Sequence, residues 1–213
     1  MAANTLTAEV VLRWMENCAE TFTSHKDELT ALDAAIGDAD HGANMARGFT
    51  AVKGKLVELR DKDIGAILKT VAMTLISTVG GASGPLYGTF FLQAGTGANG
   101  KRELTPAELA TVFNTGLLGL VSRGKAAVGE KTMVDALVPA VAALKAAEGD
   151  SISNVLARAV EAAKKGADST VSLVAKKGRA SYLGERSAGH LDPGAASSVL
   201  LLEALQKAEA TGS

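Results

Sequence analysis

The stretch LDAAIGDADHGANM, residues 32–45, decides how the chain folds because it connects two helical segments through a short, charged turn. Its two glycines let the backbone turn tightly. Its carboxylates Asp33, Asp38 and Asp40 fall within eight positions, in a setting otherwise rich in alanine and apolar residues. The stretch is therefore a helix–loop–helix connection that concentrates negative charge.

Helical periodicity continues on both sides of this connection and along the rest of the chain. The clearest helix start is Thr105 followed by Pro106 and Glu108, a cap, a proline at the first position and an acid at the third. Eight helices are expected: 8–25; His41 or Ala43 to about 59; 64–79; one after 80–88 ending near 94; 106 to about 123; one after 129–132 ending near Glu148; one capped by Ser151 or Ser153 ending near 176; and 195–210. With no confident strand, repeat or linker, the sequence predicts one all-α domain over 1–213.

The connections between these helices are longer and richer in glycine than helical bundles usually need. In an up-and-down array, every second connection falls at the same end of the molecule. The odd-numbered connections are residues 33–44, 80–88, 123–132 and 178–194, all rich in Gly, Ser, Thr or Asp. We therefore expect these connections to meet at one end and to carry the functional site.

Composition excludes several classes of protein. Of the 213 residues, 47% are apolar and the net charge is −1, which argues against disorder and against a basic nucleic-acid surface. The apolar runs are too short to span a membrane, and the N-terminal residues lack the apolar core of a signal peptide. The single cysteine, Cys18, is expected to be a buried structural thiol in a cytoplasmic protein.

The acidic cluster predicts a metal site. Carboxylate, phosphate and water oxygens are the ligands that Mg²⁺ prefers. Asp33, Asp38 and Asp40 would hold one or two ions that a bound polyphosphate completes, and the ions would remove the repulsion between the acids. The alternative is a solvated acidic turn that caps the next helix. An EF-hand is excluded because its later ligands are missing.

The residues around the acids suggest an anion site. His41 and Asn44 begin a helix and could bond a phosphate or ribose, although His41 could equally be an ordinary helix-terminal residue. In GGASG, residues 80–84, glycines allow close approach and Ser83 adds a hydroxyl beside a helix N-terminus. Glycines that serve helix packing are the alternative, and no Walker loop is present.

The two later connections offer further candidates. In GEKTMVDA, residues 129–136, Thr132 and Met133 could face a ligand, or Thr132 could cap a helix and Met133 lie in the core. In residues 178–194, Arg179 could pair with phosphate oxygens, and the Asp192–Pro193–Gly194 turn opens the last helix with Asp192 as its cap. Tyr182, Arg186 and His190 could instead only pin this loop. No residue combines a nucleophile with an activating base, so no catalytic side chain is assigned.

Four motifs, GDADHGANM, GGASGPLYG, GEKTMVDAL and GRASYLGERSAGHLDPGA, resemble those of the nucleotide-binding L subunits of bacterial, phosphotransferase-dependent dihydroxyacetone kinases. They occur in order across nearly the whole chain. The resemblance implies a barrel of eight antiparallel helices that holds ADP and two Mg²⁺ ions in the loops at one end.

The resemblance also implies roles for particular residues. Asp33, Asp38 and Asp40 correspond to the metal ligands. The positions that correspond to nucleotide contacts are His41, Gly42, Ala43, Asn44, Ala82, Ser83, Gly124, Met133, Arg179, Asp192, Pro193 and Gly194. Where the family usually has glycine between the last two aspartates, this chain has Ala39, which matters only if the backbone there needs a positive φ.

By resemblance, the protein is a kinase subunit that keeps ADP as a coenzyme. A phosphohistidine protein recharges the ADP, and the phosphoryl group passes to dihydroxyacetone held on a separate K subunit. One alternative is a kinase subunit that exchanges ATP and acts on dihydroxyacetone or a related keto-sugar or acyl substrate. Another is a protein that binds a transcription regulator in a manner that depends on ADP.

Overall fold

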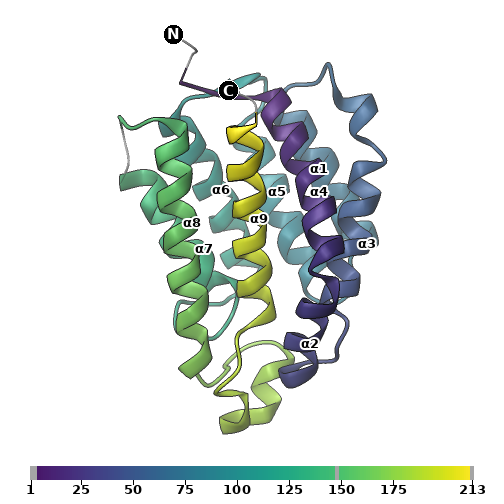
Figure 1. The fold of residues 1–213 in the computed structure, drawn as a ribbon, viewed down its shortest axis with the longest axis vertical. Coiled ribbons are helices and arrows are strands. Elements are labelled where there is room, and N and C mark those ends of the chain that lie inside the picture. Colours follow the sequence, from purple (N-terminus) through teal and green to yellow (C-terminus); the bar gives the residue numbers. More distant parts are fainter. Residues whose placement is uncertain (1–3, 147–148, 212–213) are drawn as a thin grey trace.

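The structure, a computed structural model, describes residues 4–146 and 149–211 and is all-helical apart from one minimal strand pair (Figure 1). Its α-helices are α1 (Ala8–Ser24), α2 (Lys26–Ile36), α3 (His41–Lys53), α4 (Ile64–Thr78), α5 (Ser83–Gly97), α6 (Pro106–Gly124), α7 (Met133–Ala146), α8 (Ile152–Ser169) and α9 (Pro193–Ala210). The 3₁₀ segments are η1 (Leu56–Leu59), η2 (Thr170–Ser172) and η3 (Arg179–Ser187). The all-α prediction is confirmed.

Side-chain caps fix several helix starts where the sequence predicts them. Thr105 accepts a hydrogen bond from the backbone N–H of Glu108, whose carboxylate accepts from the backbone N–H of Thr105, so the predicted capping box forms. Thr7 and Ser151 cap α1 and α8 in the same way. Each cap satisfies backbone N–H groups that the first turn of a helix leaves without partners.

Aromatic side chains fill the centre of the helix array. Trp14 stacks on Phe113 with ring centroids 5.9 Å apart and donates its indole N–H to the carbonyl of Leu201 at 2.8 Å. Phe22 stacks on Phe49 with centroids 4.7 Å apart. Such pairs contribute about 0.5–1.5 kcal/mol each beyond the burial of their surface. The core thus ties α1 to α3, α6 and α9, and Cys18 on α1 is buried as expected.

The expected count of eight helices is wrong, because the described residues contain nine. The first helix stops at His25, whose backbone N–H and ring Nδ1 both lie 2.9 Å from the carbonyl of Thr21. The chain then turns and forms α2, which buries Leu29, Asp33 and Ile36 on one face. This helix carries the first of the three aspartates, so the missed element matters for the site.

Other differences concern helix ends. The seventh expected helix, α8, stops at Ser169 because the hydroxyls of Ser169 and Thr170 bond carbonyls three residues earlier, both at 2.6 Å. The fourth, α5, begins at Ser83 inside the glycine-rich stretch and runs to Gly97. Strands β1 (Leu6–Thr7) and β2 (Glu103–Leu104), unexpected from the sequence, pair antiparallel. The predicted end near Glu148 lies outside the described residues.

Helices α4 and α5 lie unusually close together. A Cβ atom added to Gly95 would lie 2.8 Å from the carbonyl oxygen of Gly65, and one on Gly88 would lie 2.3 Å from Cγ1 of Ile76. At the turn between the helices, a Cβ on Gly84 would lie 2.2 Å from the carbonyl oxygen of Val79. Glycine is therefore needed along the length of this pair, and of the glycines in residues 80–84 Gly84 serves packing as the alternative predicted.

The functional loops gather at one end of the array. Helix α2 and the segment between α8 and α9 occupy the lower end in Figure 1. Within the described residues, none of the helices has the length and apolar character needed to cross a membrane.

Candidate functional site

All four odd-numbered connections line one cavity of about 760 Å³ at this end of the molecule, as their spacing predicts. Its walls are Asp33, Ile36, Gly37, Asp38, Asp40, His41, Gly81, Ala82, Ser83, Pro85, Leu86, Leu120, Arg123, Gly124, Ala126, Lys131, Thr132, Met133, Val134, Lys177, Gly178, Arg179, Ala180, Tyr182, Asp192, Pro193 and Gly194. A cavity of this size accommodates a small-molecule ligand.

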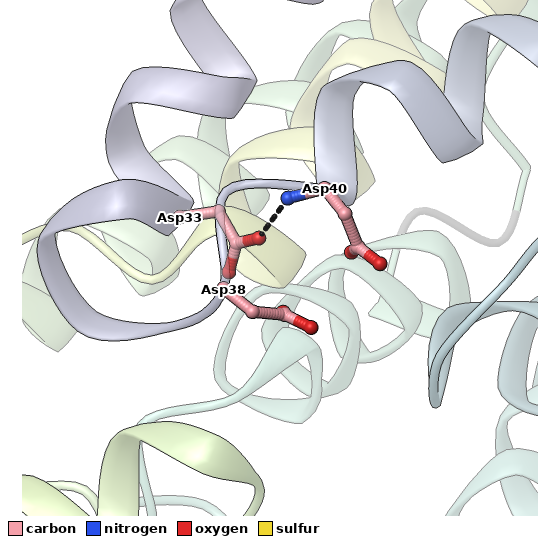
Figure 2. Close-up of side chains that lie close together, drawn as sticks. All are labelled: Asp33, Asp38 and Asp40. Atoms are coloured by element: carbon pink, nitrogen blue, oxygen red, sulfur yellow. Dashed lines mark hydrogen bonds between the residues drawn. The ribbon is translucent and has the colours of Figure 1, made fainter.

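The three aspartates converge on one edge of the cavity (Figure 2). One carboxylate oxygen of each of Asp33, Asp38 and Asp40 lies within 4.8 Å of the others. An all-oxygen donor set on a cavity wall fits Mg²⁺, which takes one or two carboxylates and completes its shell with phosphate and water oxygens. The residues present therefore fit the ion that the sequence predicts.

Asp33 also caps the next helix, as the alternative for the acidic turn predicts. Its Oδ2 accepts hydrogen bonds from the backbone N–H of Asp40 at 2.9 Å and of His41 at 3.1 Å, so this buried carboxylate caps α3. A Cβ on Gly37 would lie 2.0 Å from its Oδ1, so glycine is required there. Asp40, at the N-cap position of α3, makes no side-chain capping bond, which leaves its carboxylate free for a ligand.

Asp38 is paired with a cation from across the cavity. Its Oδ2 lies 3.0 Å from NH2 of Arg179, and both side chains are partly exposed. The two residues lie on the walls formed by the α2–α3 connection and by η3. This ion pair brings the arginine that the sequence assigns to phosphate next to the acids that it assigns to metal.

Ala39 adopts the left-handed conformation, with φ of +61°. This is the position at which the resembling family has glycine, and an L-residue in this region costs about 1–2 kcal/mol. The conformation turns the chain between Asp38 and Asp40 so that both carboxylates reach the cavity edge. Ala39 therefore holds this turn in a strained conformation.

The 79–84 connection provides a backbone wall. Gly81 has φ of +63° with no atom within 4 Å of the position of a Cβ, and no side chain caps α5. The first N–H groups of α5 are thus available to an anionic ligand at the positive end of the helix dipole. Ser83, in the first turn, places its hydroxyl 3.0 Å from Nδ1 of His41.

His41 is buried beneath this wall. Its Nδ1 contacts the hydroxyl of Ser83, and its Nε2 contacts the hydroxyl of Ser197 at 2.9 Å. Burial lowers the pKa of His41, against the opposing fields of Asp33 and Asp40. The ring is therefore held between α5 and α9 by hydrogen bonds to both nitrogens, unlike that of an ordinary exposed residue at a helix end.

Three predicted ligand contacts do not line the cavity: Gly42, Ala43 and Asn44. Gly42 is needed for packing, since its Cβ would lie 2.0 Å from the carbonyl oxygen of Lys26 on α2. The Asn44 amide supports the neighbouring loop, with Oδ1 accepting from Arg47 and lying against Gly80. Gly42 and Asn44 therefore support the walls of the cavity without facing it.

In the α6–α7 connection, Thr132 and Met133 combine the two alternatives. Met133 is buried and also lines the cavity, as do the apolar Leu86 and Leu120. The Thr132 hydroxyl accepts from the N–H of Val134. Buried Asp135 accepts from the backbone N–H groups of Gly129 and Thr132 and so orders the turn. Gly124 lines the cavity as predicted.

Lys131 was not predicted as a site residue. Its side chain is 1% exposed, its φ is +60°, and its amine donates to the carbonyls of Thr170 and His190. Burial lowers the pKa of Lys131, while the nearby Asp192 and Asp135 oppose this shift. The amine therefore fastens the α8–α9 segment to the α6–α7 connection. Nothing in its local sequence signals burial, because both acceptors lie far along the chain.

The last wall is the turn that opens α9. Asp192 is buried and caps the helix by accepting from the N–H of Ala195 at 2.7 Å, as predicted. Burial raises the pKa of Asp192 to about 7, with Lys131 pulling in the opposite direction. Tyr182 and Arg186 do not pin the loop, since both side chains are exposed; Tyr182 is 87% exposed at the cavity mouth. His190 contributes only its carbonyl.

Comparisons with known proteins identify a matching family. Residues 35–207 match the DAK2 domain family. The chain is 48% identical over 197 residues to the ADP-binding subunit DhaL of the PEP-dependent dihydroxyacetone kinase of Escherichia coli K12, covering 92% of this chain and 94% of that one. It is 44% identical over 201 residues to the ADP-binding subunit DhaL of the PTS-dependent enzyme of Lactococcus lactis, covering 94% and 97%.

A solved structure gives the same fold. The dihydroxyacetone kinase from C. freundii in complex with AMP-PNP and Mg²⁺ superposes with a TM-score of 0.71 at 29% identity, over 92% of this chain and 33% of that one. The matched family, the sequence identity and the fold therefore agree. The chain belongs to the DAK2 domain family, together with the L subunits of the bacterial dihydroxyacetone kinases.

Proposed function

We propose that this protein is the L subunit of a dihydroxyacetone kinase and carries ADP and ATP, with two Mg²⁺ ions, in the cavity between its four loops. The observation that carries the proposal is the convergence of three carboxylates, a helix N-terminus and an apolar wall on that single cavity. Each of these features suits one part of a magnesium nucleotide.

The residues divide the ligand between them. Asp33, Asp38 and Asp40 would hold the ions, which neutralise phosphate charge when bound. The first N–H groups of α5 and the hydroxyl of Ser83 would bond phosphate oxygens. The apolar side chains of Leu86, Leu120 and Met133, which line the cavity from α5, α6 and α7, would lie against the base.

Arg179 completes this arrangement. Its guanidinium is 3.0 Å from Asp38 and partly exposed, so a rotation of the side chain would bring it to the phosphates. Phosphoryl transfer needs positioning and charge neutralisation more than covalent chemistry by the protein. We therefore assign no nucleophile or base within this chain.

The relatives are called PEP-dependent or PTS-dependent, and this wording supports a particular cycle. A phosphohistidine donor protein would phosphorylate bound ADP, and the resulting ATP would phosphorylate dihydroxyacetone on a separate K subunit. The bound nucleotide would then be a coenzyme that remains in place between turnovers. We place this cycle in the cytoplasm, where a buried thiol such as Cys18 stays reduced.

Retention of nucleotide is the first test. Protein loaded with ADP and Mg²⁺ and passed through gel filtration should keep nucleotide and metal in a fixed ratio to chain. Asp38→Ala should lose both, whereas Asp27→Ala, an exposed acid in the first turn of α2, should keep them. Equal retention by the two variants would show that the acidic cluster does not hold the metal and the nucleotide.

The donor is tested with the K subunit and a phosphorylated donor protein. Product should form without free ATP. A requirement for stoichiometric free ATP, together with fast release of nucleotide, would instead identify the kinase subunit that exchanges ATP. A pull-down with a transcription regulator, with and without ADP, would test the remaining partner.

A further inference from the structure

A chain of hydrogen bonds leads from the cavity into the protein. The hydroxyl of Ser83 lies 3.0 Å from Nδ1 of His41, Nε2 of His41 lies 2.9 Å from the hydroxyl of Ser197, and that hydroxyl lies 2.7 Å from the hydroxyl of Tyr87. The chain joins α5, α3 and α9. Beyond Ser83, its members are all buried.

The hydrogens in this chain can be counted. A hydroxyl has one hydrogen, and a neutral imidazole carries one on either Nδ1 or Nε2. If His41 has its hydrogen on Nε2, it donates to Ser197, and Ser83 must donate to the bare Nδ1. If His41 has its hydrogen on Nδ1, it donates to Ser83, and Ser83 is free to donate into the cavity.

The inner end of the chain permits both arrangements through the Ser197 hydroxyl, and the backbone carbonyl of Pro193 is a further acceptor for a ring N–H of His41. The hydroxyl of Ser197 is within reach of two acceptors, the carbonyl oxygen of Gly194 at 3.0 Å and Nε2 of His41 at 2.9 Å. It can therefore turn its hydrogen to either one, while the hydroxyl of Tyr87 donates to it. Ser198 makes the matching contacts, to Gly194 at 2.8 Å and Tyr87 at 3.0 Å, but none to His41.

An anionic ligand distinguishes the two arrangements. Oxygens of a fully ionised phosphate only accept hydrogen bonds, so Ser83 can bond one only by donating its hydrogen. With the ligand bound, Ser83 must then accept from His41 rather than donate to it. This step rests on the proposed function, which puts phosphate beside Ser83.

We propose that His41 is a positioning residue that sets the direction of the Ser83 hydroxyl. When phosphate is bound, the ring hydrogen of His41 is on Nδ1, Ser197 donates to Nε2, and the hydrogen of Ser83 points to the ligand. The number of protons in the chain is the same in both arrangements; the ring exchanges its hydrogen with solvent. Ser197, buried beneath the site, thereby controls the hydrogen bond from Ser83 to phosphate without contacting the ligand itself.

Nitrogen NMR of histidine-labelled protein reads this directly. The chain has three histidines, and the variants His25→Asn and His190→Asn, which leave the His41 ring and its partners intact, assign the His41 signals by elimination. With ADP and Mg²⁺ bound, Nδ1 of His41 should give the signal of a protonated nitrogen and Nε2 that of a bare one. A hydrogen on Nε2, or on both nitrogens, would overturn the proposal.

Binding measurements provide the matched comparison. Ser197→Ala removes the donor to Nε2 and should weaken ADP binding about tenfold, the usual effect of one hydrogen bond. Ser198→Ala, which keeps every His41 contact, should change binding less than about twofold. In a Ser83→Ala background, Ser197→Ala should have no further effect, because the hydroxyl that it orients is gone.

The outcomes separate this inference from the proposed function. If ADP binds but Ser197→Ala and Ser198→Ala weaken binding equally, His41 does not set the direction of the Ser83 hydroxyl, and the proposed nucleotide site is unaffected. If ADP does not bind, the proposed function fails. The same spectra recorded with magnesium pyrophosphate then test the positioning role of His41 alone. An unchanged His41 signal with a hydrogen on Nε2 under saturating pyrophosphate would then exclude it.

Discussion

Replacing Ala39 by glycine should stabilise the protein. Ala39 is exposed, has φ of +61° and stands between two of the clustered aspartates. Glycine adopts this left-handed conformation without the steric cost that a Cβ imposes. Because the side chain is an exposed methyl group, its removal sacrifices little packing.

The size of the effect follows from two opposing terms. Relief of the left-handed conformation contributes about 1–2 kcal/mol. The extra freedom of glycine in the unfolded chain costs about 0.4–1 kcal/mol. The free energy of unfolding should therefore rise by about 0.5–1 kcal/mol, which corresponds to an increase in Tm of about 1–4 °C in a chain of this size.

Urea unfolding of the ligand-free protein, followed by circular dichroism, measures this difference. The control is Ala34→Gly, an exposed position within α2, which should lose about 1 kcal/mol because glycine is a poor helix former. The two Ala→Gly changes thus have opposite signs although they lie five residues apart. If Ala39→Gly also destabilised the protein, the turn would not be strained and the argument would be refuted.

Three further predictions concern the charged residues of the site. Asp38→Ala should abolish retention of ADP through gel filtration while circular dichroism shows an unchanged helix content. Lys131→Met leaves the buried carbonyl of Thr170 and the partly buried carbonyl of His190 without their donor and should lower the free energy of unfolding by about 1–3 kcal/mol, whereas Lys125→Met, at an exposed lysine that is also left-handed, should cost less than about 0.5 kcal/mol in the same urea titration. Burial raises the pKa of Asp192 to about 7, above its unfolded value of about 3.9, so the folded protein binds the proton more tightly. The free energy of unfolding of the ligand-free protein should then fall as the pH rises from about 4 to 7, and Asp192→Asn should flatten this slope.

Much of the fold was predictable because its signals are local. The capping box at Thr105 and the Asp192 cap mark helix starts within a few residues of sequence. The alternation of loop ends also predicted that four connections would meet. The end of the first helix near His25 was predicted, but helix α2, which follows at once, was missed because apolar periodicity did not separate it from the connection that carries the aspartates.

The site was predictable where short motifs carry its chemistry and not where distant segments meet. The three aspartates are close in sequence and converge as expected. Lys131 is buried only because residues around 170 and 190 fold over it, so its role needed the tertiary structure. Conversely, Gly42 and Asn44 belong to the same motif as the aspartates but face the neighbouring helix and loop. Neighbouring positions in one motif therefore did not reveal which residues face the cavity and which pack against the rest of the protein.

The glycine-mediated contact between α4 and α5 has a consequence for how a ligand enters and leaves. Because a single added methyl group would collide with backbone or side chain at Gly65, Gly84 or Gly95, this pair of helices is closely packed, and we expect the wall that it presents to move little. The opposite wall differs, since Gly178 and Gly184 have positive φ and no atoms near the position of a Cβ. Opening of the mouth should therefore be one-sided: the α8–α9 segment swings outward while the Ser83 side stays still, so the rate of nucleotide release is governed by the segment that Lys131 fastens.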